Sequence, residues 1–204
     1  MAEPGARTES GTDAAILDAA ERLVQVRGFN GFSYADIAQE LSVTKASLHY
    51  HFPGKADLGQ ALIDRYAERF ALALDAIEAR GGTPVDELDA YAGLYADVFV
   101  DHRMCLCGML AAEYETLPEP MQGSIVSFFD VNEAWLARVL TRGRRDRSLG
   151  FQGTPRDTAR GIIAALEGAM LVGRAKATGE GFRPAARRLV RSLAGADGAR
   201  RGQG

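Results

Sequence analysis

Residues 33–55 read SYADIAQELSVTKASLHYHFPGK, and this stretch decides the predicted fold. Ser33 and Asp36 have the S-x-x-D spacing of a capping box, which marks the start of a short helix. Its apolar residues follow at helical spacing: Ile37, Ala38 and Leu41. A tight turn at 42–43 leads to a second short helix at 44–51, which Pro53-Gly54 ends.

A longer helical pattern at 12–28 precedes these segments, with Thr12 as its expected N-cap and Gly28 as its C-terminal stop. Three helices in this order, the last two joined by a tight turn, predict a helix-turn-helix unit. In such a unit the second short helix lies in the major groove of DNA. The pattern also fits three packing helices of an all-α domain, with Tyr50 and His51 half-buried.

Polar side chains on the outer side of the second short helix are the candidate DNA contacts. Their heads suit phosphate oxygens or base edges, and helix N-termini also offer N–H groups to phosphate. These side chains are Thr44, Lys45, Ser47, Tyr50 and His51. Ser33 starts the first short helix, and Lys55 follows the turn, where it could reach a backbone phosphate.

Residues 28–58 resemble the DNA-binding region of TetR-family transcriptional repressors. The family pattern reads G-x-x-x-x-S/T-x-x-x-I-A-x-x-x-x-V-S-K-x-x-x-Y-x-H/Y-F-x-x-K-x-x-L, and this sequence follows it in order and without gaps. The matching residues are Gly28, Ser33, Ile37, Ala38, Val43, Lys45, His51, Phe52, Lys55 and Leu58.

The resemblance implies a nine-helix, all-α, homodimeric repressor that a ligand releases from a palindromic DNA operator. Position by position, it implies DNA contacts at Lys45, Ser47, Tyr50, His51 and Lys55, and phosphate contacts at the helix starts Ser33 and Thr44. His49 stands where the family usually has Tyr. An imidazole there could keep a phosphate contact whose strength depends on pH.

The rest of the chain shows helical periodicity and no sustained strand alternation. Further helices are predicted at 56–80, 84–101, 103–115, 121–142, 155–178 and 184–193. Together with the first three, they make nine. We expect a DNA-binding domain at 1–55, a ligand-binding and dimerisation domain at 56–195, and a disordered tail at 196–204.

The composition is that of an ordinary globular protein, with 47% hydrophobic residues and a net charge of −3. The charge is uneven: 5 basic and 7 acidic residues in 1–55, 4 and 15 in 56–137, and 15 and 5 in 138–204. No apolar run is long enough for a membrane span, and the first residues lack a signal-peptide pattern. We therefore expect a cytoplasmic protein.

Aromatic and sulfur-containing residues in the middle of the chain suit an apolar ligand pocket among helices. The candidates are Tyr66, Phe70, Tyr95, Phe99, Cys105, Met109, Glu113, Phe128 and Trp135. Glu113 would orient a polar group of the ligand or pair structurally. The alternative for the others is that they only fill the core.

Cys105 and Cys107 fall in the helix predicted at 103–115, where residues two apart point about 200° from each other. One thiol would face inward and the other a different surface, without a disulfide or shared metal. Arg103, His102 and the helix N-terminus could lower the pKa of a thiol and make it reactive. The alternatives are an electrophile- or redox-sensing repressor and two inert, buried thiols.

The last two predicted helices carry a face of small and apolar residues that suits a two-fold dimer interface. The candidates are Ile162, Leu166, Met170, Leu189 and Leu193, and the alternative is packing within one subunit. No motif for nucleophilic catalysis, phosphate binding or metal ligation is found. We therefore expect a DNA-binding regulator without enzymatic activity, cofactor or metal, whose partners are operator DNA and a small-molecule inducer.

Overall fold

The computed structural model describes residues 11–99, 103–176 and 181–194. Within these ranges the chain forms nine α-helices and one short 3₁₀ helix, which confirms the predicted all-α class. The helices are α1 (Gly11–Arg27), α2 (Tyr34–Leu41), α3 (Lys45–His51), α4 (Lys55–Arg80), α5 (Pro84–Phe99), α6 (Leu106–Ala112), the 3₁₀ helix η1 (Tyr114–Thr116), α7 (Glu119–Arg145), α8 (Pro155–Ala175) and α9 (Phe182–Leu193). The predicted tail at 196–204, the ends of the helices predicted at 84–101 and 155–178, and His102 lie outside the described residues.

Several helices begin where the sequence signals predict, because a side chain satisfies the free backbone N–H groups there. The Thr83 hydroxyl accepts from the Asp86 N–H at 3.3 Å and donates to the Asp86 carboxylate at 2.6 Å. Thr154 and Asp157 repeat this arrangement at the start of α8. Gly28 ends α1 with φ +82°, a conformation that residues with a side chain rarely adopt.

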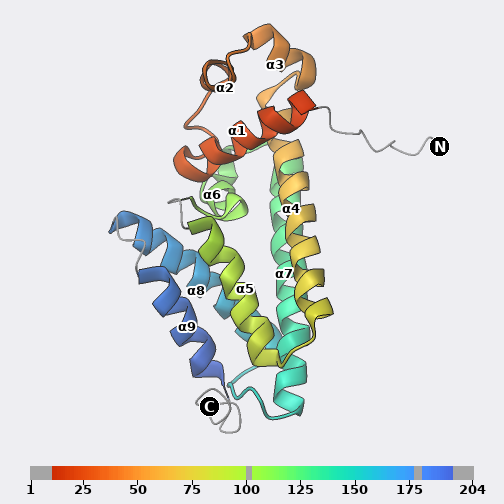
Figure 1. Cartoon of the computed structure of the whole chain (residues 1–204), viewed down its shortest axis with the longest axis vertical. Coiled ribbons are helices and arrows are strands. Elements are labelled where there is room, and N and C mark those ends of the chain that lie inside the picture. Colours follow the sequence, from red (N-terminus) through yellow and green to blue (C-terminus); the bar gives the residue numbers. More distant parts are fainter. Residues whose placement is uncertain (1–10, 100–102, 177–180, 195–204) are drawn as a thin grey trace, which may run out of the picture.

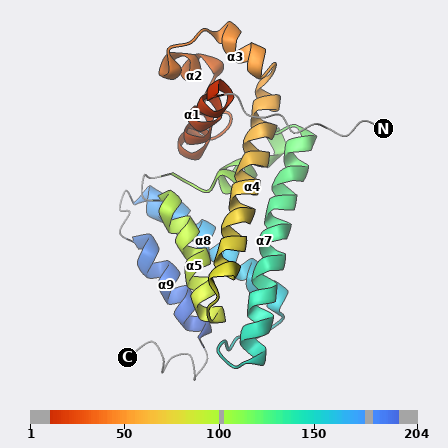
Figure 2. The ribbon, with the colours of Figure 1, turned by 45° about the vertical axis from the view of Figure 1, so that its right-hand side comes forward.

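The helices divide into a small group and a larger body (Figure 1). The small group, α1 to α3, lies at one end of the molecule. Helix α4 runs from α3 down the length of the body and packs beside α7, as the second view also shows (Figure 2). Helix α7 in turn packs against α5 and α8, and α9 covers α5 and α8. Helix α6 lies between α1 and this body.

Several predicted helix boundaries differ from the structure. Helix α7, predicted at 121–142, covers Glu119–Arg145, and α9, predicted at 184–193, begins at Phe182. Two further differences change a predicted cap or a predicted helix. Helix α1 begins at Gly11, so Thr12 lies inside it and is not its N-cap. The helix predicted at 103–115 is shorter: Met104 and Cys105 have no helical structure, α6 covers Leu106–Ala112, and η1 follows. The Met104 N–H instead donates to the Gln25 carbonyl at 3.2 Å. This contact between distant segments replaces the first turn that the local pattern predicts.

None of the described helices combines the length and apolar character that a membrane crossing requires.

Candidate DNA-binding surface and ligand groove

Helix α2 and the turn after it have the geometry of a helix-turn-helix unit. The Ser33 hydroxyl accepts from the Ala35 N–H at 3.2 Å, and the Asp36 carboxylate accepts from the Ser33 N–H at 2.8 Å, so the predicted capping box is confirmed. The Ser33 hydroxyl, which donates to the Asp36 carboxylate at 2.7 Å, and the Ser33 N–H together hold the pKa of Asp36 below its usual value. Ser42 ends α2 in the left-handed conformation with φ +55°, which turns the chain sharply into α3.

Helix α3 presents several predicted DNA contacts to the outside. Leu48 is its buried residue and packs beneath it, whereas Tyr50 is 85% exposed. Thr44, Lys45 and His49 are also exposed, as is Ser33 at the start of α2, and Ser47 is half-buried. The Thr44 hydroxyl caps α3 by accepting from the Ser47 N–H at 3.2 Å. Lys45 and Tyr50 are therefore the side chains of α3 most open to a partner.

Two predicted DNA contacts have partners inside the protein. Lys55 donates to the carbonyl oxygens of Phe29 and Phe32, and its ammonium lies 4.7 and 4.3 Å from the centres of their rings. Burial lowers the pKa of Lys55. His51 lies against the carboxylate of Asp13 on α1, with Nδ1 2.5 Å from Oδ1. Both side chains therefore help to hold the small domain together. Neither is free to face DNA in the way that the sequence predicts.

His49 is exposed, but its ring is already in contact with the protein. Its Nδ1 lies 3.1 Å from the Pro53 carbonyl oxygen, and its ring centre is 4.7 Å from that of Tyr34. The imidazole therefore braces the end of α3, and its other nitrogen, Nε2, is the atom left for a phosphate.

The junction between α3 and α4 is held by residues that the sequence reasoning missed. The buried Tyr34 hydroxyl lies 2.8 Å from the carbonyl oxygens of Phe52 and Gly54, one on each side of Pro53. Burial and the nearby charge of Asp57 raise the pKa of Tyr34 to about 12. Asp57 caps α4 by accepting from the Gly54 N–H at 2.8 Å. The spacing Gly54-x-x-Asp57 is a signal that could have found this cap.

A partly buried ion cluster joins α4 to α1. Arg65 binds the carboxylates of Asp18 at 2.9 Å and Glu21 at 3.0 Å, and Arg69 also binds Glu21. The side chains of Arg65 and Glu21 are each only 12% exposed. Burial strengthens such a pair against screening and makes the loss of either partner costly. Helix α4 is thus fastened to the small domain at two levels, at α3 and at α1.

Of the two roles expected for Glu113, the contacts agree with the structural one and not with the ligand contact. Its carboxylate accepts from the backbone N–H groups of Phe29, at 2.6 Å, and Asn30, at 3.3 Å. The Asn30 side chain also donates to the Thr116 hydroxyl at 2.8 Å. Glu113 therefore holds the loop between α1 and α2 against the end of α6. The partners are more than 80 residues apart in sequence, so no local pattern could reveal the contact.

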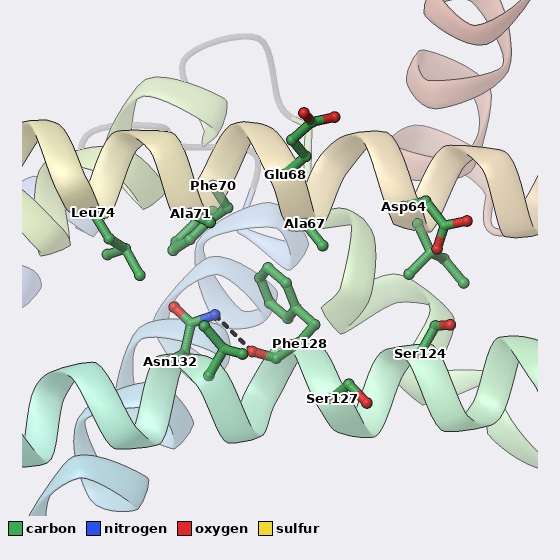
Figure 3. Close-up of a pocket in the computed structure, with 12 residues that line it drawn as sticks. Asp64, Ala67, Glu68, Phe70, Ala71, Leu74, Ser124, Ser127, Phe128 and Asn132 are labelled. Carbon is green, nitrogen blue, oxygen red and sulfur yellow. Dashed lines mark hydrogen bonds between the residues drawn. The ribbon is translucent and has the colours of Figure 1, made fainter. Parts of the chain in front are cut away.

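A groove of about 320 Å³ lies between α4 and α7 (Figure 3). Its described lining residues are Ile63, Asp64, Ala67, Glu68, Phe70, Ala71, Leu74, Ser124, Ser127, Phe128, Val131 and Asn132. Phe70 and Phe128 are the two predicted ligand residues among them. Their rings meet edge to face at 5.2 Å. The volume is at the lower end of the roughly 300–1,000 Å³ typical of small-molecule sites.

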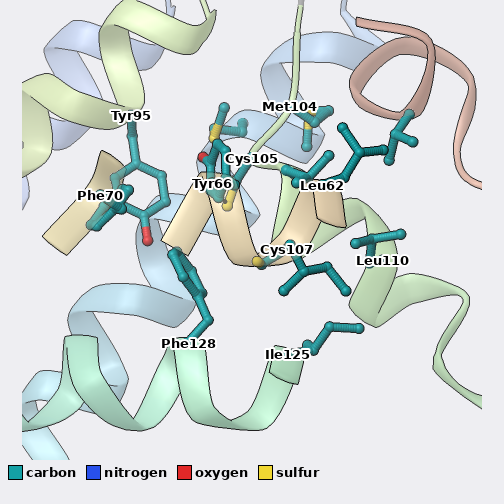
Figure 4. Packing of buried hydrophobic residues seen from close by; sticks show 14 of the residues in the cluster. Leu62, Tyr66, Phe70, Tyr95, Met104, Cys105, Cys107, Leu110, Ile125 and Phe128 are labelled. Carbon is teal, nitrogen blue, oxygen red and sulfur yellow. Dashed lines mark hydrogen bonds between the residues drawn. The ribbon is translucent and has the colours of Figure 1, made fainter. Parts of the chain in front are cut away.

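The other predicted ligand residues lie behind the groove or away from it. Tyr66 and Tyr95 belong to the buried cluster behind Phe70 (Figure 4). Trp135 stacks on Tyr91 at 5.6 Å. Phe99 packs on Phe182 of α9, and Met109 lies 3.5 Å from the Arg174 guanidinium. The groove residues that sequence reasoning missed are mainly small or polar. Ile63, Ala67, Ala71 and Leu74 follow a helical period on α4, but such a period does not distinguish a groove wall from the core.

Both cysteines point into the core, contrary to the prediction that they face different surfaces. Cys105 precedes α6, so the angle expected between helical neighbours does not apply to it. Its thiol lies 3.6 Å from the Tyr66 hydroxyl and is hydrogen-bonded to Glu167 of α8. Burial raises the pKa of both thiols, which is the opposite of the predicted lowering.

The predicted interface residues of α8 are covered by the protomer itself. Ile162, Leu166 and Met170 are buried against the body, and Leu189 and Leu193 of α9 are half-buried. The opposite face of α8 carries Gly161, Ala164, Ala165, Gly168, Leu171, Val172 and Ala175, all of them exposed except Gly168, which is half-buried. Leu171 and Val172 are 61% and 55% exposed. The apolar helical period of α8 predicted the face that is buried within the protomer. The exposed face consists mainly of the small residues that lie between those apolar positions in the sequence.

An N-terminal helix-turn-helix unit mounted on a helical body defines a DNA-binding regulator. A family model described as "Bacterial regulatory proteins, tetR family" matches residues 16–62. The fold also matches the crystal structure of a TetR-family transcriptional regulator from Agrobacterium tumefaciens, with a TM-score of 0.85 and 33% identity over 89% of this chain and 96% of that one. The chain belongs to the TetR family of bacterial transcriptional regulators, a family of regulators and not of enzymes.

Other relatives agree with this assignment. The chain is 29% identical to the transcriptional repressor NemR of Escherichia coli K12 over 168 residues, which are 80% of this chain and 84% of NemR. The reduced form of E. coli NemR has the same fold, with a TM-score of 0.74, 26% identity and coverage of 89% of this chain and 97% of that one. The regulator TtgR of Pseudomonas putida is 38% identical over 88 residues, 43% of this chain and 41% of TtgR.

Proposed function

We propose that this protein is a homodimeric repressor that binds a palindromic operator through α3 and leaves it when a small molecule enters the groove between α4 and α7. One observation carries the proposal: α4 is both a wall of the groove and the direct continuation of the DNA-reading unit. Lys45, Tyr50, Ser47, His49 and the helix starts Ser33 and Thr44 are the proposed DNA contacts. The proposed domains are 1–55 and 56–195, with the boundary at the first residue of α4.

Contacts at the start of α4 and near its middle supply a physical route from the groove to α3. Ala67, Phe70 and Ala71 face the groove, and Arg65, less than one turn away, binds α1. At its start, α4 is joined to α3 through Tyr34 and Asp57. A ligand that fits one spacing of α4 and α7 better than another shifts the population of α3 positions by its difference in affinity.

The groove assignment predicts that filling the groove blocks release without blocking DNA binding. Ala67→Phe adds a ring to the groove wall, whereas Leu72→Phe, at a 61% exposed site of α4, is the matched control. Overfilling costs about 1–3 kcal/mol, so Ala67→Phe should need about 5- to 150-fold more compound for release.

The measurement starts from a footprint on the DNA that flanks the gene. A screen for compounds that lower fluorescence anisotropy of the labelled operator complex then supplies the inducer. If Ala67→Phe keeps the operator affinity but weakens release by the compound, this result would support the groove as the inducer site. Equal release of both variants and of the unsubstituted protein would place the inducer elsewhere.

The outer face of α8 is the proposed dimer interface. Its residues are small, so a second copy of α8 could approach closely, and two-fold pairing would space two α3 helices for a palindrome. A side chain at Gly168 would meet no described atom within 4 Å, and the same is true of Gly123 on α7. Substitution at either site therefore disturbs no packing within the protomer.

Gly168→Glu is expected to convert the protein to a folded monomer, because it places a charge in the proposed interface. Burying an uncompensated charge costs several kcal/mol, enough to raise the dimer dissociation constant by about 100-fold or more. Light scattering after gel filtration and circular dichroism would measure mass and helicity. Gly123→Glu is the control and should stay dimeric, and a dimeric Gly168→Glu protein would refute this interface.

The thiol-switch alternative has less support than the groove. A reactive cysteine acts as an exposed thiolate, and here burial both hides the two thiols and raises their pKa.

A further inference from the structure

We propose that the inducer is an organic cation with an aromatic or aliphatic body, and that Asp64 and Glu68 attract its positive head. This inference rests on the proposed function and specifies the ligand class of the same groove. Its basis is the combination of an apolar, aromatic floor with a rim whose only formal charges are negative.

The floor of the groove suits the body of such a ligand. Leu74, Ile63 and the rings of Phe70 and Phe128 provide apolar surface between the two helices (Figure 3). Aromatic faces also attract cations, because the ring carries negative charge density on its faces. The floor alone, however, would accept a neutral ligand as readily as a charged one.

The rim gives the charge preference. Asp64 points from α4 towards Ser124 of α7 (Figure 3). Glu68 also lines the groove one turn further along α4, with its carboxylate on the side of α4 away from α7. Among the twelve described residues that line the groove, none is basic. Asp64 accepts a hydrogen bond from the Gln60 amide at 2.8 Å, which leaves its charge uncompensated. No described Lys or Arg forms a salt bridge with either carboxylate.

Serine hydroxyl groups on the α7 side of the groove could also bind the polar head of the ligand. Ser124 of α7 faces Asp64 across the groove and already accepts a hydrogen bond from Gln60 at 2.8 Å, and Ser127 also lines the groove. Serine oxygens can accept from an ammonium N–H as carboxylates do. An anionic ligand would meet the Asp64 carboxylate at close range, with the negative charge of Glu68 on the same stretch of α4, and like charges disfavour binding.

The test compares three probes that share one skeleton: 4-phenylbutylamine, 4-phenyl-1-butanol and 4-phenylbutyrate. Calorimetry on the full-length protein should give binding in the order amine, alcohol, acid. Two exposed carboxylates and a cation–π contact predict about tenfold tighter binding of the amine than of the alcohol. This preference should shrink as salt is added, because salt screens exposed charges.

Substitutions distinguish the contribution of the two carboxylate charges from that of the apolar groove. In Asp64→Asn combined with Glu68→Gln, the amine should bind no better than the alcohol, while affinity for the alcohol stays unchanged. The matched control is Asp75→Asn, which removes an exposed acid of α4 that does not line the groove. It should keep the full preference for the amine.

The outcomes distinguish this inference from the proposed function. If the amine and alcohol bind the unsubstituted protein equally, and Ala67→Phe weakens both, the groove binds ligands but the cation preference is refuted. If the acid binds best, the cation preference is also refuted. If none of the three probes binds, or if Ala67→Phe binds them all unchanged, the groove itself is refuted as the ligand site.

Discussion

Replacing Tyr50 or Lys45 with alanine is expected to lower operator affinity by about 30-fold or more. Both side chains stand on the outer face of α3, and Tyr50 is 85% exposed. A specific contact to a base is worth about 1–3 kcal/mol, and a dimer makes each contact twice. Substitutions at exposed sites usually change stability by less than about 0.5 kcal/mol, so both variants should remain folded.

The salt dependence of operator binding distinguishes a contact to phosphate from a contact to a base. If Lys45 contacts a phosphate, Lys45→Ala should reduce the slope of log affinity against log salt by about 1 per contact, whereas Tyr50→Ala should leave it unchanged. Fluorescence anisotropy at several salt concentrations gives both quantities. Lys176→Ala removes an exposed lysine at the end of α8 and serves as the control. Affinity that stays the same in both α3 variants would refute the assignment of α3 as the reading helix.

Glu167→Gln is expected to make the protein more stable at pH 8 by up to about 3 kcal/mol. Glu167 faces α6 from α8, and burial raises its pKa from 4.5 to about 7. A side chain added at Gly108 would come within 2.3 Å of its carboxylate, so the two helices leave it little room for water. Burying the ionised carboxylate is therefore costly, and the neutral amide avoids that cost.

The direction of the pH effect follows from the two pKa values. Between pH 4.5 and about 7 the folded protein keeps a proton on Glu167 that the unfolded chain releases, so stability falls as the pH rises through this range and levels off above it. The groups that face Glu167 stay neutral there, because burial raises the pKa of the thiols and phenols among them: Cys105, Cys107, Tyr66, Tyr91 and Tyr95.

Urea unfolding at fixed protein concentration, repeated from pH 5 to pH 8.5, measures this effect. The difference between Glu167→Gln and the unsubstituted protein should grow with pH up to about 7 and then stay constant. Glu115→Gln, at an exposed site of η1, is the control and should track the unsubstituted protein. Parallel pH profiles for all three proteins would show that Glu167 does not titrate in this range.

Local signals predicted the parts of the fold that local interactions determine. The Ser33–Asp36 and Thr83–Asp86 caps join residues three apart, and the stop at Gly28 depends on one residue's own conformation. The exposed positions of Lys45 and Tyr50 follow from the burial of Leu48 on the other side of the same short helix.

Contacts between residues far apart in the sequence determine the features that local signals did not predict. Lys55 and His51 belong to the same small domain as Lys45, but they already contact groups of the protein: the carbonyl groups of residues 29 and 32 and the carboxylate of residue 13. Glu113 was expected at a ligand because it is an acid in an apolar stretch, and its partners lie 83 and 84 residues away. Similarly, the period of α8 identified a buried face without showing which helix covers it.

The two hydrogen bonds of Tyr34 make α3 and the first turn of α4 move as one piece. From the groove near Glu68 to Lys55 is 13 residues, or about 20 Å of helix. Over that arm, a tilt of about 5° displaces α3 by nearly 2 Å, and opposite displacements in two subunits change their separation by about twice as much. The half-sites of an operator are fixed about 34 Å apart, and hydrogen bonds tolerate only a few tenths of an ångström. In the proposed mechanism the junction would act as a stiff lever, which would turn a slight widening of the groove into a mismatch with DNA.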